Sequence, residues 1–525
     1  MKNFDCIIVG SGINSLVCAA IMARNGRKVC VLERNDRLGG CIRTDQVTVP
    51  GFNHDVLSTA HPLFVTSPGY AVLADALHGN GLEYTNNDSP TGVLLRDGRS
   101  LILTTSREKN VEAFESLATG DGAAYQESMA LIENNASLIF GLLGGELWSF
   151  GTGKLLLAEI WRNNLHTTAS FFGEAMQSCR TWLEGSFDSD LVQALLAPWI
   201  LHTGLGTESS FSGLMGRLIP FTLEQVGMPV VKGGSYKLVE AFEKHIVEHG
   251  GELHHSTEVC KIITENGKAT GVETASGNMY LAKRAVVCNV TPGQLYQDLL
   301  DPNDVSEKVL QQSRSYRYGR GDMQIHLALE EPPEWPTPEL QQVTMMHLTG
   351  GLDSISKAIN EADRGFLPAS ATIVVAQPTT VDPSRAPDGK WILWIQLQEL
   401  PRILKGDQRG EIAIPADGQW TETVREQYAD RIVDRLAEQI PNLKRSIVGR
   451  RVFSPADLET INVNLVGGDP YSGECSIDQF MFWRPLRAVR GHRTPIKNLY
   501  HIGASTHPGP GLGGVSGYLV AKALS

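Results

Sequence analysis

Residues 5–40 read DCIIVGSGINSLVCAAIMARNGRKVCVLERNDRLGG, and this stretch decides the fold. Phe4 to Val9 form a short apolar run that ends at glycine, as is typical of a strand buried on both faces. Apolar residues then recur at helical spacing up to Gly26, and residues 28–33 form a second apolar strand. A strand, a glycine turn, a helix and a strand in this order predict a Rossmann-like α/β domain that binds a dinucleotide.

Each small residue of the turn has its own task. Gly10 allows the tight turn, and Gly12 lets the backbone approach a pyrophosphate at the positive end of the helix. Serine occupies position 15, where a third glycine usually permits close packing of helix on strand, and we expect packing to survive with a slightly wider crossing. Glu33 is placed to accept both ribose hydroxyls, and its charge disfavours the 2′-phosphate of NADP.

A second glycine pair, Gly39–Gly40, follows soon after Glu33. Such a pair lets the backbone pass close to a ligand lying across the first turn, which favours FAD while leaving NAD open. Near the C-terminus, residues 498–502 read as a strand, followed by a glycine-rich crossing and a helix that begins near Gly514. Two glycine turns that open helices at opposite ends of the chain indicate one long cofactor held by a discontinuous domain.

The composition excludes several function classes. The 525 residues are enough for two or three domains, and the net charge of -12 provides no basic footprint for nucleic acid. Eight cysteines are scattered without a CxxC pair, which argues against a zinc ribbon and a dithiol redox centre, and we expect no metal site. No signal peptide is visible at the first strand, so we expect a cytoplasmic protein.

One long apolar stretch leaves membrane contact open. It runs from Ser137 to Trp161, and Glu146, Lys154 and several glycines interrupt it, so it lacks the ~20 clean apolar residues of a bilayer span. It predicts buried helices of a substrate domain. The alternative is a surface that dips into a membrane to collect a lipid, which would make the protein membrane-associated.

Several motifs together resemble a known family. PGFNHDVLSTAHPLF (50–64), APWILHTGL (197–205) and STHPGPGLGGVSG (505–517), with the N-terminal turn, resemble the phytoene-desaturase-related flavoproteins, which include carotenoid desaturases, carotenoid isomerases and retinol saturase. That group lies in the amine-oxidase-like superfamily of FAD proteins. The resemblance covers nearly the whole chain and is closest to uncharacterised bacterial members. Ser15 and Cys41 depart from the common patterns, although neither threatens FAD binding.

The resemblance implies a set of FAD-binding positions and a division of the chain. Val259 would present its backbone to the adenine, and Gly503, Gly514 and Val515 would hold the pyrophosphate–ribityl and flavin regions. The other implied FAD contacts are Gly10, Gly12, Ile13, Asn14, Glu33, Arg34, Gly39, Gly40, Ser58 and Thr59. We expect a glutathione-reductase-type FAD domain at residues 1–90, 226–295 and 446–525. An α+β substrate domain, with an antiparallel sheet and a helical cap, would occupy residues 91–225 and 296–445.

The expected chemistry is hydride transfer from a C–H bond of a carotenoid-, terpenoid- or acyl-like substrate to flavin N5, with O2 or a quinone as electron acceptor. His61, His202 and His507 are candidate proton carriers, although each could instead be a structural histidine bonded to backbone. Three competing functions stay open: an oxidase of amines or alcohols that uses O2, a flavin-dependent isomerase, and a flavin-bearing scaffold with little activity. An amine oxidase would need an aromatic cage, for which Trp199, Trp391, Trp394 and Trp483 are available.

Overall fold

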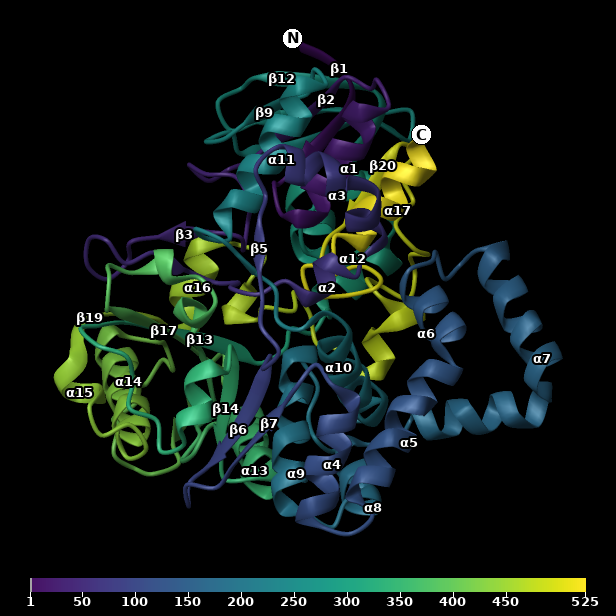
Figure 1. Ribbon diagram of the computed structural model, residues 1–525. Coiled ribbons are helices and arrows are strands. Elements are labelled where there is room, and N and C mark those ends of the chain that lie inside the picture. Colours follow the sequence, from purple (N-terminus) through teal and green to yellow (C-terminus); the bar gives the residue numbers. More distant parts are fainter. Residues whose placement is uncertain (1) are drawn as a thin grey trace.

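The computed structural model describes residues 2–525, and a mostly parallel seven-stranded sheet carries the N-terminal turn (Figure 1). Strands β9, β2, β1, β12 and β20 pair in parallel in that order, and the β10–β11 hairpin adds to the first half of β12 in antiparallel fashion. Asn266 and Gly267 form the turn of this hairpin and have positive φ angles of 50° and 73°, respectively. The strands are β1 (Lys2–Val9), β2 (Val29–Leu32), β9 (Glu252–His254), β10 (Val259–Glu265), β11 (Lys268–Thr274), β12 (Met279–Asn289) and β20 (Leu499–Ile502).

Helices on one face of this sheet form the first core. Almost every residue of α1 is buried, because this helix packs between the sheet and three other helices rather than on the surface. The helix α17, which begins at Val515 as expected, packs along α1, so the two ends of the chain meet here. The helices are α1 (Ile13–Arg24), α3 (Pro68–Gly79), α11 (Tyr236–Glu248) and α17 (Val515–Leu524). A Rossmann-like α/β domain was therefore correctly predicted.

A second seven-stranded sheet forms the expected substrate part. Its order is β19-β13-β17-β16-β14-β6-β7, and its pairs are antiparallel except for the parallel pair of β14 with β6. The helix α14 (Glu422–Ala437) covers one face, and Thr421 caps its N-terminus. The strands are β6 (Thr91–Leu95), β7 (Ser100–Leu103), β13 (Gly321–Leu329), β14 (Met345–Thr349), β16 (Ile373–Ala376), β17 (Trp391–Leu400) and β19 (Ile447–Phe453).

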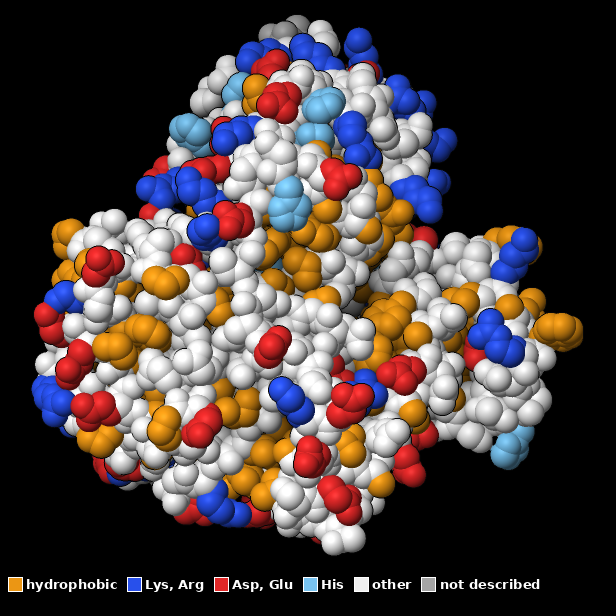
Figure 2. All heavy atoms as spheres, viewed as in Figure 1, with side chains coloured by type: hydrophobic (Ala, Val, Ile, Leu, Met, Phe, Trp, Pro, Cys, Tyr) orange, Lys and Arg blue, Asp and Glu red, His pale blue; other side chains and the backbone are white. Residues whose placement is uncertain are grey.

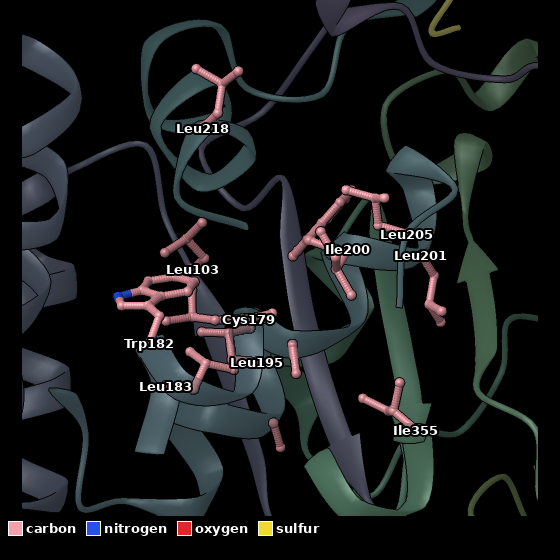
Figure 3. Packing of buried hydrophobic residues seen from close by; sticks show 14 of the residues in the cluster. Leu103, Cys179, Trp182, Leu183, Leu195, Ile200, Leu201, Leu205, Leu218 and Ile355 are labelled. Carbon is pink, nitrogen blue, oxygen red and sulfur yellow. The ribbon is translucent and has the colours of Figure 1, made fainter. Parts of the chain in front are cut away.

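The other face of the second sheet carries a helical layer. Figure 3 shows its core, in which Ile200 and Leu201 of η1 lie beside the strands. Trp182 of α8 lies among the helices, where its Nε1 donates to the Ser128 hydroxyl of α5 at 3.1 Å. Leu218 of α10 belongs to the same buried cluster and reaches toward the middle of the molecule. The elements are α4 (Arg107–Leu117), α5 (Asp121–Asn134), α6 (Ala136–Leu143), α8 (Cys179–Ser186), α9 (Asp190–Leu196), η1 (Ala197–Thr203), α10 (Ser212–Val226) and α13 (Leu352–Asp363).

The helix α7 (Phe150–Ala175) projects from this layer as an arm that is bent at Asn164 (Figure 1). Phe150 and Trp161, which we expected inside a substrate domain, are instead 81% and 91% exposed. Hydrophobic side chains gather over the arm and the face beside it (Figure 2). No helix within residues 2–525 is both long enough and apolar enough to cross a membrane.

The strand pairing refines the expected division of the chain. Strands β6 and β7, from residues 91–103, and β19, from residues 447–453, all belong to the second sheet. We therefore propose that the first insertion supplies an edge of the substrate sheet as well as its helical cap. We also propose that the last return to the FAD domain begins after Phe453 rather than at residue 446.

Candidate cofactor and substrate site

One cavity of about 1180 Å³ runs from the first sheet to the second. Its first end is lined by the N-terminal turn, Glu33 and Val259, and its other end by α10, η1 and the inner face of β13 and β17. Pockets for a single drug-sized ligand hold roughly 300–1,000 Å³. A larger continuous volume accommodates an extended cofactor with a second molecule beside it.

Two helix N-termini converge at the first end of the cavity. Asn14 of α1 accepts a hydrogen bond from the Ser516 hydroxyl of α17 at 2.7 Å, and the same hydroxyl accepts the Gly503 N–H at 2.9 Å. Ile13 and Val515, the first residues of the two helices, both line the cavity. The first N–H groups of a helix have no intrahelical acceptor and carry the positive end of its dipole. This end therefore favours an anionic group such as a pyrophosphate.

Two of the expected glycines are required by close contact with Asn289 at the end of β12. Gly10 has a φ of +84°, and a Cβ there would lie 3.1 Å from the Asn289 carbonyl oxygen. Gly503 has a φ of +110°, and its Cβ would lie 2.2 Å from Asn289 Oδ1. Both positions combine left-handed backbone with lack of space, so only glycine fits there.

Ser15 has a specific partner in this structure. Its side chain is fully buried, and its Oγ accepts a hydrogen bond from Asn289 Nδ2 at 3.0 Å. A glycine could not accept this bond. The serine therefore joins α1 to the end of β12, while Gly10 and Gly503 pack on the same asparagine.

Glu33 organises the turn through three hydrogen bonds. Its Oε2 accepts the N–H and the hydroxyl of Ser11 at 2.9 and 2.6 Å, and its Oε1 accepts the Asn35 N–H at 2.9 Å. The Ser11 hydroxyl also accepts the Gly39 N–H at 2.9 Å, which ties the second glycine pair to the first turn. A carboxylate offers about four acceptor positions, so one remains at Oε1. We therefore propose that Glu33 holds one ribose hydroxyl rather than both.

The remaining expected FAD contacts are mostly brought together. The lining includes Gly10, Gly12, Ile13, Asn14, Glu33, Arg34, Gly40, Ser58, Thr59, Val259, Gly514 and Val515. Gly39 and Gly503 lie behind this surface, where their N–H groups donate to the hydroxyls of Ser11 and Ser516, respectively. The glycine cradle, the paired helix N-termini and the acidic residue fit an adenine dinucleotide, and the length of the cavity fits FAD. Their individual contacts with the cofactor stay proposals.

The three candidate histidines have different surroundings. His202 lines the cavity, and its Nε2 lies 2.9 Å from His347 Nε2. Burial lowers the pKa of His202 to about 4. It is therefore a neutral imidazole at neutral pH. One ring nitrogen then carries a proton that it can donate, and the other ring nitrogen can accept one.

His61 and His507 lie outside the cavity lining in the part of the chain that the structure describes. His61 is buried edge-on against Tyr84, and His507 Nε2 pairs with the backbone oxygen of Leu142 at 2.9 Å. Burial lowers the pKa of both rings to about 4. We therefore restrict the proposal of a proton-carrying histidine to His202.

Sequence reasoning missed Asn289 and most of the second end of the cavity. Asn289 follows a strand without any motif, so only its place opposite Gly10 in the fold identifies it. At the second end, Trp199 and Trp394 of the expected aromatic set line the cavity, together with Met215, Leu218, Ile219 and Phe221 of α10. Asp322 and Gln324 of β13 and Gln396 and Gln398 of β17 line it too, and their alternation with apolar residues was a visible signal.

Comparison with known proteins identifies the class of site. The family model of flavin-containing amine oxidoreductases matches residues 16–515. A limonene dehydrogenase subunit of Castellaniella defragrans is 25% identical, with 100% of this chain and 95% of that protein covered. The zeta-carotene-forming phytoene desaturase of Myxococcus xanthus is 26% identical, with 96% and 90% covered. A solved putrescine oxidase variant shares the fold with a TM-score of 0.62 at 16% identity, covering 99% of this chain and 98% of that one.

Proposed function

The chain belongs to the family of flavin-containing amine oxidoreductases and is an FAD-dependent oxidoreductase, and we propose that it oxidises a carbon–hydrogen bond of a hydrophobic substrate. The observation that carries this proposal is the continuous cavity of about 1180 Å³, which joins the dinucleotide cradle to a largely apolar chamber beneath α10. Relatives named as dehydrogenase of limonene and desaturase of phytoene support a terpenoid substrate. Bound FAD would supply hydride acceptance at its N5 atom.

The residues of this chain would bind the cofactor, orient the substrate and exclude water from the site. The N–H groups of Ile13, Asn14 and Val515 would hold the pyrophosphate and flavin regions, and Glu33 the ribose. Leu218 and Phe221 of α10 would exclude water from the substrate, which strengthens every electrostatic interaction in the chamber. His202, held by His347, would supply a neutral imidazole beside the substrate.

An anaerobic reduction experiment tests this proposal. The FAD-loaded protein is mixed without oxygen with limonene, phytoene or putrescine, and the visible flavin band near ~450 nm is followed. We expect bleaching with a lipophilic compound and none with putrescine. Readmission of air or addition of a soluble quinone then shows which acceptor restores the band. Bleaching by putrescine alone would contradict the proposal.

A second candidate is an oxidase of amines or alcohols that releases hydrogen peroxide. Trp199 and Trp394 favour it, because both line the chamber and supply aromatic faces that can attract an amine. The structural likeness to putrescine oxidase shows the fold alone. Peroxide release in air, at the same rate as turnover, would favour this candidate over a desaturase that uses a quinone.

We also propose that the α7 arm contacts a membrane from which a lipophilic substrate is collected. Phe150, Leu157, Trp161 and Leu165 are exposed along it, while Phe140 and Leu143 of the adjoining α6 line the cavity. In a flotation assay, the protein should rise with phosphatidylcholine–phosphatidylglycerol vesicles to the top of the gradient. The double variant Phe150→Glu/Trp161→Glu should remain unbound at the bottom. Leu117→Glu, on exposed α4, is the control and should float. Equal flotation of all three proteins would contradict membrane contact by the arm.

A further inference from the structure

Four polar side chains form a row on the second sheet, along one wall of the chamber. Asp322 and Gln324 on β13 face the cavity, and so do Gln396 and Gln398 on the neighbouring β17. The residues between them, Met323 on β13 and Leu397 on β17, point into the opposite core under α14. Because strand side chains alternate between faces, the polar residues occur at every second position only on the cavity side.

This polar row is buried and incompletely bonded. Asp322, Gln324 and Gln398 are at most 4% exposed. Asp322 Oδ2 accepts from Gln396 Nε2, and Gln398 Nε2 donates to the Tyr471 hydroxyl at 3.1 Å. Three acceptors of this row, Asp322 Oδ1, Gln324 Oε1 and Gln398 Oε1, have no hydrogen-bond partner within residues 2–525. Buried polar atoms are usually paired, so three unpaired acceptors in one row indicate that a ligand supplies the donors.

Within residues 2–525, no lysine or arginine forms an ion pair with the Asp322 carboxyl group. The guanidinium of Arg320, two residues away, instead contacts Asp363 and the backbone oxygens of Gly204 and Leu205. Burial raises the pKa of Asp322 well above its ordinary value. In the neutral form Oδ2 still accepts from Gln396, so Oδ1 carries the proton and can donate it to a ligand hydroxyl. In the ionised form, which an approaching ammonium group would favour, Oδ1 is an acceptor.

The opposite wall of the chamber is mostly apolar, although Thr222 and Gln225 of α10 also line the cavity. Met215, Leu218, Ile219 and Phe221 of α10 form it, and Phe140 of α6 extends it. Two walls of different polarity select a molecule with two different sides. A pure hydrocarbon would cover the apolar wall and leave the acceptors of the polar row unpaired, which a site with buried acceptors penalises strongly.

We propose that the substrate has an apolar skeleton that carries a hydrogen-bond-donating group, a hydroxyl or an amine, held by Asp322, Gln324 and Gln398. This inference rests on the proposed function, because it describes the substrate of the same cavity. It narrows the hydrophobic substrate to an oxygenated or aminated one. The apolar skeleton lies against α10, and the donor group lies against β13 and β17.

Equilibrium binding of three molecules with one skeleton tests the proposal. The FAD-loaded protein is titrated calorimetrically, without oxygen, with p-menthane, menthol and menthylamine. We expect menthol or menthylamine to bind at least about tenfold more tightly than p-menthane. The hydrophobic effect alone would give the opposite order, because p-menthane gains most by leaving water for an apolar site. Preference for menthol that survives Asp322→Asn identifies a neutral donor, whereas preference for menthylamine that disappears in Asp322→Asn identifies an ammonium group.

Isosteric variants assign the preference to the polar row. Asp322→Leu and Gln324→Met should each lower the preference at least about fivefold, because each removes one acceptor. The matched control is Glu399→Gln, a buried carboxyl on the same strand β17 whose partner is Thr372 on the side away from the cavity. It should keep the preference. The two row variants remain independent tests if one of them fails to fold.

Three results overturn the inference. They are equal binding of the three compounds, tighter binding of p-menthane, and binding of none of them. Loss of FAD from both Asp322→Leu and Gln324→Met, with normal FAD content in Glu399→Gln, also overturns it, because the polar row would then hold the cofactor. Reduction of the flavin by a hydrocarbon would leave the proposed function standing while this inference falls. A protein that prefers menthol but takes up no FAD would overturn the proposed function and leave the hydrogen-bonding role of the polar row standing.

Discussion

At the scale of single residues, Glu33 links the turn to the cofactor. Its carboxylate already holds Ser11 and Asn35, so it is preorganised for one more donor. Glu33→Gln loses charge-assisted bonds worth about 1.5–3 kcal/mol each, so we expect FAD affinity to fall at least about tenfold. Titration of apoprotein with FAD measures this change. Glu252→Gln, at a half-buried glutamate that begins β9 and pairs with Lys2, is the control and should leave the affinity unchanged.

Ser15 makes the second prediction at this scale. Ser15→Gly restores the usual glycine of the dinucleotide turn but leaves Asn289 Nδ2 without its acceptor. We expect the free energy of unfolding to fall by about 1–2 kcal/mol, from the lost bond and the added helix entropy. Urea denaturation measures it, and Ser15→Ala separates the two causes because alanine removes the bond alone. A glycine variant as stable as the wild type would show that the bond contributes nothing.

At the scale of elements, a buried charge cluster joins three segments. Arg385 of η6 (Pro383–Arg385) bonds Asp55 of β4 (His54–Asp55) at 2.8 Å and Asp382 at 2.7 Å, and it also donates to the Val231 carbonyl. Arg385 and Asp55 are almost fully buried. The guanidinium therefore ties the second insertion to the segment that follows the dinucleotide turn.

Removing this arginine should be costly. Arg385→Met leaves two buried carboxylates without their partner, and we expect the free energy of unfolding to fall by about 3–5 kcal/mol. Chemical denaturation measures the change. Arg445→Met breaks an exposed pairing with Glu331 and Glu334, and it should change stability by less than about 1 kcal/mol. Equal effects of the two substitutions would contradict a structural role for the cluster.

Strands and helices with strong local signals were predictable from the sequence. The dinucleotide turn, the Asn266–Gly267 hairpin, α14 and α17 all have short-range signatures in apolar period, turn residues or caps. The prediction of buried helices for residues 137–161 is correct for Leu138 and Leu142 of α6 and wrong for α7, because an apolar run of helical period does not show whether another element will cover it. The apolar stretch instead projects at Phe150 and Trp161.

At the scale of the whole molecule, contacts between distant segments were beyond sequence reasoning. Asn289 meets Ser15 and Gly503 only after three separate segments enter one sheet. His61 and His507 were selected for their motifs, yet packing places both rings outside the cavity lining in the described part of the chain. The polar row was readable as alternation along two strands, but the direction that it faces depends on how the second sheet packs against α10.

Buried histidines predict how the whole fold responds to acid. Burial lowers the pKa to about 4 in His61, His202, His326, His501 and His507, from about 6.5 in the unfolded chain. Between these values the unfolded state binds more protons, so stability rises with pH and is lost as the pH falls from about 6.5 toward 4. Glu399, whose pKa burial raises to about 7, opposes this trend in part.

Urea denaturation at pH 7.5 and pH 5.0 measures the response. We expect the free energy of unfolding to be lower at pH 5.0 by on the order of several kcal/mol. His61→Phe should flatten the slope, because within residues 2–525 neither ring nitrogen of His61 has a partner and one titrating group is removed. A stability that is the same at both pH values would contradict burial of these histidines in their neutral form.

The central claim is that one cavity holds FAD between the two sheets, and the cofactor content of the purified protein tests it most directly. The visible absorption spectrum is recorded, and the cofactor released by heat is identified by chromatography. The account predicts flavin bands near ~370 and ~450 nm and release of about one FAD per chain. A colourless protein that also fails to take up added FAD would contradict it.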